Sequence, residues 1–211
     1  MLKIKICGIT SIAEAVAAAE EGADFIGLIF TKSPRRVDVA VAREIVRALP
    51  STATPVGVFM DQPFEEVRGI LRQTALSFAQ LHGNESPDYA ATLGVNVFKT
   101  FENYSPEKLE SLRAYDTFAF LLDIPKGTQS RSSIDAHWAT CAKKFGRVIL
   151  SGGLTPDTVG SVIRKVRPFG VDVCRATEAS PGRKDRSKVR DFILSARDAA
   201  HATTTVKVKV R

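Results

Sequence analysis

The chain has 211 residues, of which 44% are hydrophobic and 25% charged, and this is ordinary for one globular domain with a sizeable core. No apolar run approaches the roughly 20 residues of a membrane helix, and lysines interrupt the apolar start that a signal peptide would need. The net charge of +7 suits nucleic acid or a small anion, but the basic residues are scattered rather than striped, which favours the anion. We therefore expect no membrane partner and no nucleic acid.

From the N-terminus onward the sequence predicts a strand, a turn and a helix, eight times in succession. Apolar runs such as FIGLIF are typical of strands buried on both faces of a parallel sheet, and the intervening segments have helical spacing. The expected strands are Leu2 to Cys7, Phe25 to Phe30, Pro55 to Phe59, Phe78 to Leu81, Val95 to Thr100, Thr117 to Asp123, Arg147 to Ser151 and Gly170 to Val173. The expected helices are Ile12 to Glu21, Val37 to Leu49, Pro63 to Leu76, Pro87 to Leu93, Pro106 to Ala114, Ile134 to Lys144, Thr155 to Val166 and Asp185 to Ala199.

This alternation predicts an α/β fold, a single (β/α)8 TIM barrel over residues 1–200. Eight units in 211 residues have about 26 residues each, close to the size of a compact barrel unit. A doubly wound open sheet also alternates strands and helices, but no GxGxxG motif follows the first strand. Residues 201–211 alternate valine with lysine, and we expect them to form a disordered basic tail.

The first strand places Lys3, Lys5 and Cys7 on one face, because side chains alternate along a strand. A barrel interior could supply partners for that face. Cys7 lies at the carboxyl end of the strand, where βα barrels carry their chemistry. It is either a buried apolar thiol or a base whose pKa Lys5 helps to lower. Three cysteines without a CxxC motif argue against a disulfide scaffold or a zinc site, and we expect a reducing cytoplasm.

Asp123 ends the apolar sixth strand, where an ionisable side chain needs a partner or a role. A turn or helix-capping aspartate is the alternative, but no helix is expected directly after it. Cys7 and Asp123 would lie across the mouth of the barrel, and such a pair suits proton transfer between two groups.

Gly152 and Gly153 precede the helix that follows the seventh strand, where backbone N–H groups can approach a phosphate. Paired glycines also form ordinary turns, but barrels often bind phosphate in the loops after strands 7 and 8. The loop after the eighth strand contains Arg175, which could bind the same phosphate or be a solvated surface charge.

Arg35 and Arg36 follow the second strand and could clamp a carboxylate or form a basic turn. We expect Gln80 and His82 to be a satisfied pair in the barrel, and Lys99 to form a structural ion pair in the barrel rather than a Schiff base. His137 and Trp138 are expected to pack in the sixth helix.

Taken together, these motifs resemble the phosphoribosylanthranilate isomerase family, barrel enzymes of tryptophan biosynthesis. The resemblance runs in order through KICGIT, GADFIGLIF, SPRRV, GVF, QLHG, LLD, LSGGL, VDV and SPGRKD, which cover nearly the whole chain. KICGIT, QLHG and LSGGL are specific as a set.

The resemblance implies that Cys7 is the general base, Asp123 the general acid and Arg35 the ligand of the anthranilate carboxylate. It implies an Amadori rearrangement of N-(5-phosphoribosyl)anthranilate to a 1-deoxyribulose phosphate, with a small phosphosugar as substrate and no metal or other cofactor.

Two loops depart from the family pattern. After LLD the family has a glycine-rich loop, whereas this chain has IPKGTQSRSSIDAHW with Gly127 alone. After VDV the family has SSGVE, whose small residues contact the phosphate, whereas here Cys174, Arg175 and Ala176 replace the first three. The departures leave open a regulatory barrel that binds a phosphosugar or a partner, and a related isomerase with another phosphosugar amine as substrate.

Overall fold

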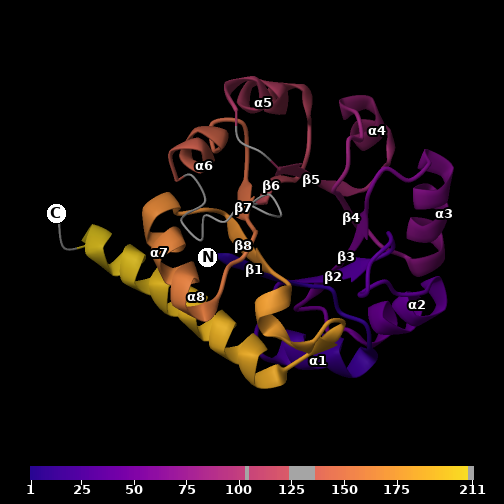
Figure 1. Cartoon of the computed structure of the whole chain (residues 1–211), viewed down its shortest axis with the longest axis horizontal. Helices are drawn as coiled ribbons and strands as arrows, with labels where there is room; N and C mark the ends of the chain where they lie inside the picture. The colour runs from indigo at the N-terminus through magenta and orange to yellow at the C-terminus, as the bar shows by residue number, and fades with distance from the viewer. Residues whose placement is uncertain (103–104, 124–135, 209–211) are drawn as a thin grey trace.

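The computed structural model describes residues 1–102, 105–123 and 136–208, and in these residues eight parallel strands form one closed barrel (Figure 1). Each strand is hydrogen-bonded to its neighbours in sequence order, and the first strand closes the barrel against the eighth. The strands are β1 (Lys3–Cys7), β2 (Phe25–Ile29), β3 (Thr54–Phe59), β4 (Phe78–Leu81), β5 (Asn96–Glu102), β6 (Ala119–Asp123), β7 (Val148–Leu150) and β8 (Gly170–Val173).

The helices form a ring outside these strands, as Figure 1 shows. They are α1 (Ile12–Glu20), α2 (Val39–Ala48), α3 (Phe64–Thr74), α4 (Pro87–Thr92), α5 (Pro106–Ser111), α6 (Ala136–Ala142), α7 (Pro156–Val166) and α8 (Arg186–Val208). A 3-10 turn, Leu112–Ala114, follows α5, and a second, Arg175–Thr177, leads from β8 into a hairpin of β9 (Glu178–Ser180) and β10 (Arg183–Lys184). No helix of the described ranges is long and apolar enough to cross a membrane.

Local sequence signals determine where α7, the helix that follows the seventh strand, begins. Thr155 and Thr158 form a capping box, and Pro156 occupies the first helical turn, where its missing N–H removes no helical hydrogen bond. The helix ends at Val166, and the capping residue Arg167 has a left-handed backbone conformation. Because this start is well defined, the amino end of α7 has a set position at the mouth of the barrel.

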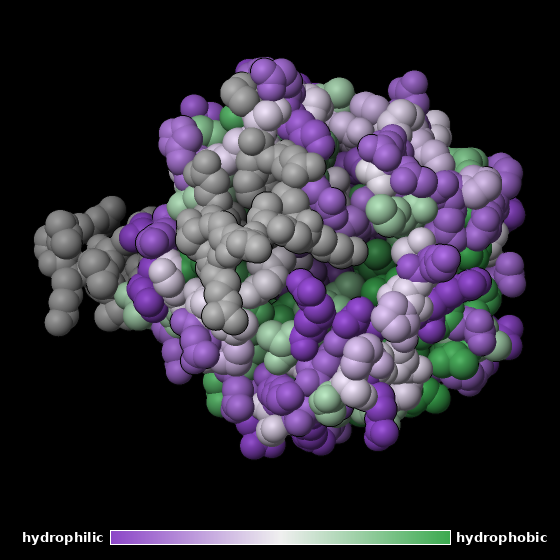
Figure 2. All heavy atoms as spheres, in the orientation of Figure 1, coloured by the Kyte–Doolittle hydropathy of each residue, from purple (hydrophilic) through white to green (hydrophobic). Residues whose placement is uncertain are grey.

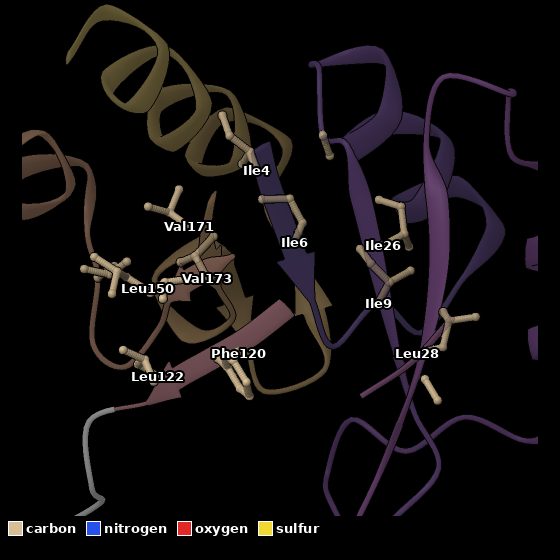
Figure 3. Close-up of a cluster of buried hydrophobic side chains, with 14 of the residues drawn as sticks. Ile4, Ile6, Ile9, Ile26, Leu28, Phe120, Leu122, Leu150, Val171 and Val173 are labelled. Atoms are coloured by element: carbon tan, nitrogen blue, oxygen red, sulfur yellow. The ribbon is translucent and has the colours of Figure 1, made fainter. Parts of the chain in front are cut away.

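The apolar core has an outer and an inner layer. The outer layer fills the space between strands and helices, and Figure 3 shows Ile4 and Ile6 of β1 in it with Val171 and Val173 of β8. A smaller inner cluster fills the amino-terminal half of the barrel. It consists of Phe25, Val56, Phe98, Ala119, Leu121 and Ile149.

A buried ion pair joins the first strand to the last inside the barrel. Lys5 pairs in register with Asp172, and Lys5 Nζ lies 2.8 Å from Asp172 Oδ1. The other carboxylate oxygen accepts a hydrogen bond from Ser151 Oγ at 2.9 Å. Burial lowers the pKa of Lys5, but Asp172 and Cys7 raise it by more, so the ammonium stays charged. The polar face that the sequence predicts for β1 therefore has its partner in β8.

The structure confirms the predicted barrel and places all eight strands within two residues of their expected bounds. The last helix is longer than predicted, because α8 continues to Val208 through most of the stretch that the sequence assigns to a disordered tail. Its backbone there is helical, and residues 209–211 lie outside the described residues. The divergent stretch after LLD also lies outside them over residues 124–135.

The buried pair predicts a stability effect at neutral pH. Asp172→Asn would leave the Lys5 ammonium without its carboxylate in a dry site, so we expect the free energy of unfolding to fall by about 3–5 kcal/mol. Urea denaturation followed by circular dichroism measures this. The control is Glu44→Gln, which removes an exposed ion pair with Arg47 and should leave the midpoint unchanged. Equal midpoints for both variants would contradict the prediction.

Candidate active site

A cavity of about 490 Å³ opens at the carboxyl end of the barrel. This volume is typical of a pocket for a small molecule. All the site residues predicted from the sequence line it, and these are Cys7, Arg35, Asp123, Gly152, Gly153, Arg175 and Ala176. They come from five different strand ends or the loops that follow them, so barrel closure brings them together. Figure 2 shows hydrophilic side chains over much of the surrounding face of the molecule.

Cys7 is a buried thiol whose surroundings favour the thiolate. A hydrogen bond from Cys174 lowers its pKa, burial opposes this, and the nearby Lys5 ammonium lowers it further. The net effect is a pKa of about 6 for Cys7. At neutral pH Cys7 is therefore a thiolate that can accept a proton from a bound molecule.

Sequence reasoning found the Lys5 contribution but missed Cys174. Hydrogen bonding to Cys7, burial and the charge of the Cys7 thiolate raise the pKa of Cys174 above its usual range. The signal was present in the alternation of side chains, because Cys174 directly follows β8 and lies two residues after the inward-facing Asp172.

Asp123 lies on the opposite side of the cavity mouth, beside a histidine and a glutamate. His82 Nε2 is 3.6 Å from Asp123 Oδ2 and 3.1 Å from Glu102 Oε1. Glu102 pairs in register with Asp123, and His82 follows β4. The sequence predicts a satisfied pair of Gln80 and His82. Their side-chain nitrogens lie 3.3 Å apart, but the buried Gln80 Oε1 has no hydrogen-bond partner among the described residues, so the pair is only partly satisfied. The contact of His82 with Asp123 was missed.

His82, Glu102 and Asp123 are also the group among the described residues that could hold a metal ion. Their ligand atoms lie within 4.8 Å of one another. Imidazole and carboxylate suit several divalent metals. The hydrogen bond between His82 and Glu102 engages two of the three side chains.

Arg35 reaches the cavity from the loop after β2 and is held by Glu178. Its Nε and Nη2 atoms donate to the two carboxylate oxygens at 2.6 and 2.7 Å. Burial raises the pKa of Glu178, but Arg35 and Lys184 lower it by more, so Glu178 is an anion. This two-point pair occupies one edge of the guanidinium and leaves the other edge for a ligand in the cavity.

The loop after β7 has the backbone of an anion site. Gly152 and Gly153 have φ of +90° and +65°, which residues with a Cβ rarely adopt. A Cβ built on Gly153 would meet no atom within 4 Å, so space is open beside this backbone. Ser151, directly before it, is tied to Asp172, and the amino end of α7 follows. Arg175 lies on the neighbouring 3-10 turn, with an exposed side chain.

Two candidates from the sequence lie away from the cavity. Lys99 forms the predicted ion pair, with Glu85 at 2.9 Å, although on the outer side of the barrel. Trp138 packs in α6 as expected, and its indole N–H donates to the Ser105 carbonyl at 3.2 Å.

The chain matches known proteins over most of its length. Residues 4–195 match the family model described as N-(5'phosphoribosyl)anthranilate (PRA) isomerase. A protein of Geobacter sp. (strain M21) with the name N-(5'-phosphoribosyl)anthranilate isomerase is 42% identical over 203 residues, which is 93% of this chain and 98% of the relative.

Two solved structures have the same fold. Phosphoribosyl anthranilate isomerase from Thermus thermophilus has a TM-score of 0.84 and 35% identity, covering 93% of this chain and 99% of its own. Another isomerase of this name is in complex with reduced 1-(o-carboxyphenylamino)-1-deoxyribulose 5-phosphate. It has a TM-score of 0.83 and 33% identity, covering 94% of this chain and 100% of its own.

The surroundings of Cys7 predict a pH dependence for its reactivity. Only the thiolate attacks iodoacetamide, so the alkylation rate should be high above pH 6 and fall as the pH decreases through about 6. Peptide mass spectrometry assigns the modified cysteine. The matched control is Cys141→Ser, in α6, which should leave the profile of Cys7 unchanged. A midpoint near 8.5, the value of an ordinary thiol, would show that its surroundings do not stabilise the thiolate.

Proposed function

The chain belongs to the N-(5′-phosphoribosyl)anthranilate isomerase family, and from this we propose how its residues carry out the isomerisation. It is an aldose–ketose type isomerase of tryptophan biosynthesis. The reaction converts N-(5′-phosphoribosyl)anthranilate to 1-(2-carboxyphenylamino)-1-deoxyribulose 5-phosphate. The observation that carries the proposal is that a thiolate and a carboxyl group line one cavity together with a glycine loop suited to phosphate.

The first step opens the ribose ring. Asp123 donates a proton to the furanose ring oxygen, the bond between C1 and that oxygen breaks, and the nitrogen lone pair forms an iminium with C1. His82 touches both Asp123 and Glu102, so it fixes the orientation of the acid.

The second step moves a proton from carbon to sulfur. The Cys7 thiolate removes the proton on C2, and the electron pair of that bond forms the double bond between C1 and C2 while the iminium nitrogen regains its lone pair. The resulting enolamine gains a proton at C1 and loses the proton of the C2 hydroxyl, which gives the ketone. The substrate nitrogen acts as the electron sink, so we propose that no metal or cofactor takes part.

The phosphate is proposed to bind between the loops after β7 and β8. Gly152 and Gly153 offer backbone N–H groups, the space beside Gly153 is open, and the helix dipole of α7 favours an anion there. Arg175 and Ala176 line the same cavity from the other loop. The guanidinium of Arg175 can meet phosphate oxygens in two places, which would replace some of the backbone contacts that small residues allow.

The anthranilate carboxylate is proposed to bind Arg35. Glu178 orients the guanidinium from one edge, and the other edge can receive a carboxylate through two hydrogen bonds. We further propose a cytoplasmic location, because the base has to remain a free thiol and the three cysteines are free in the structure.

The proposed roles of Asp123 as the acid and Cys7 as the base predict the behaviour of two variants. Cys7→Ser should lower kcat at least ~100-fold, since a hydroxyl is far less acidic than a thiol. Asp123→Asn should cause a loss of similar size, because an amide cannot supply the proton. Steady-state turnover of the purified variants measures both, and circular dichroism checks their fold. Cys141→Ser is the control and should keep the wild-type rate. Near-wild-type turnover by either variant would remove that residue from the mechanism.

The proposed role of Arg175 as a phosphate ligand can be tested by changing the loop after β8. We expect Arg175 to be a ligand, so replacing Cys174-Arg175-Ala176 by Ser-Ser-Gly should leave the affinity for inorganic phosphate similar or lower. Calorimetric titration of both proteins measures this, with Arg183→Ala on the nearby hairpin as a control that should not change it. A sharp rise in turnover after the replacement would show that Arg175 blocks the site, and would favour a regulatory barrel that binds phosphosugars.

A further inference from the structure

The strand register places Cys7 and Cys174 side by side at the seam of the barrel. In the pairing of β1 with β8, Lys5 is opposite Asp172 and Ile6 is opposite Val173. The next residues along the two parallel strands are Cys7 and Cys174. Paired residues of parallel strands point to the same side, and Lys5 and Asp172 point into the barrel. Both sulfurs therefore lie inside the mouth of the barrel, and both residues line the cavity.

Two glycines make room for the sulfur atoms. A Cβ on Gly27 would lie 2.7 Å from Cys7 Sγ, and a Cβ on Gly8 would lie 2.9 Å from Cys174 Sγ. Each distance is shorter than a real Cβ contact, so a larger residue at either position would displace a sulfur. Gly8 also has φ of +77°, which favours glycine. The backbone around the two thiols is thus closely fitted to both of them.

The backbone of Cys174 is held by its own hydrogen bonds. Its carbonyl oxygen accepts from Lys184 Nζ at 2.8 Å and from Thr177 Oγ1 at 2.8 Å. Lys184 is itself buried against Glu178, with 3% of its side chain exposed. These hydrogen bonds hold Cys174 beside Cys7 in the free protein.

The charged groups around the pair determine which sulfur keeps its proton. Lys5 of β1 and Asp172 of β8 act on Cys7. Arg35, from the loop after β2, and Lys184 of β10 act on Cys174, and Glu178 of β9 contacts both of these cations. The hydrogen bond and Lys5 lower the pKa of Cys7, whereas the pKa of Cys174 is raised, so Cys7 ionises first and Cys174 keeps the proton that it can donate.

We propose that Cys174 is a positioning residue for the base, whose thiol donates a hydrogen bond to the Cys7 thiolate and holds that sulfur ready to take the substrate proton. The catalytic part of this inference rests on the proposed isomerase function. The hydrogen bond itself is a property of the free protein and can be measured without substrate.

The first experiment follows alkylation of Cys7 by iodoacetamide between pH 5 and 10 in the full chain, for the wild type, C174A, C174S and C141S. We expect C174A to raise the apparent pKa of Cys7 by about one, since a hydrogen bond to a charged group contributes roughly that much and S–H is a weak donor. In C174S the apparent pKa of Cys7 should lie between those of the wild type and C174A, because a serine hydroxyl can also donate a hydrogen bond. C141S should follow the wild type.

Two results would overturn the hydrogen bond. If C174A has the same alkylation profile as the wild type, Cys174 does not act on Cys7. If C174S behaves as C174A does, the effect comes from packing of the sulfur rather than from donation. Both variants replace a partly exposed side chain, and circular dichroism confirms that the proteins compared are folded.

The second experiment measures kcat/KM for N-(5′-phosphoribosyl)anthranilate against pH. In C174A the acid side of the profile should move to higher pH by the same amount as the alkylation profile, with about fivefold lower activity at pH 6. An unmoved profile despite altered alkylation would refute the positioning role. Absence of turnover in the wild type would refute the isomerase function instead, while the alkylation data still decide whether the hydrogen bond exists.

Discussion

The buried contact between Lys5 and Asp172 is the interaction on which the rest of the site depends. It crosses the seam where the first and last strands meet, so it stabilises the closed barrel itself. The same ammonium lies beside Cys7, and the same carboxylate holds Ser151 ahead of the glycine loop. One ion pair therefore supports the closure of the fold, the thiolate form of Cys7 and the start of the glycine loop.

Side-chain alternation around a closed sheet separates the apolar and polar parts of the interior. Phe25, Phe98 and Ile149 belong to the apolar cluster inside the barrel, near the amino ends of the strands. Nearer the carboxyl ends of the strands, inward positions carry groups that can exchange protons or bind anions, among them Cys7 and Asp123. The aromatic cluster keeps the lower half of the barrel filled, so the open space is at the carboxyl end.

Most of the fold and the composition of the site follow from the sequence, because strand ends can be read from hydrophobic runs. Cys7, Asp123 and the glycine loop lie at such ends, and all reach one cavity. The relations between strands were harder to predict. The contacts of Cys174 with Cys7 and of His82 with Asp123 depend on register, which barrel closure sets. The length of α8 was also missed, because alternating valine and lysine does not predict a helix.

The seam also has a consequence for how the protein is made. Cys7 and Lys5 leave the ribosome first, whereas Asp172, Cys174 and Lys184 follow more than 160 residues later. At roughly 5–20 residues per second, Cys7 spends several seconds or more without these neighbours. Every contact across the seam is long-range in sequence, so it forms late and slowly compared with a local helix. The Cys7 thiol therefore gains its environment only when synthesis of the chain is nearly complete.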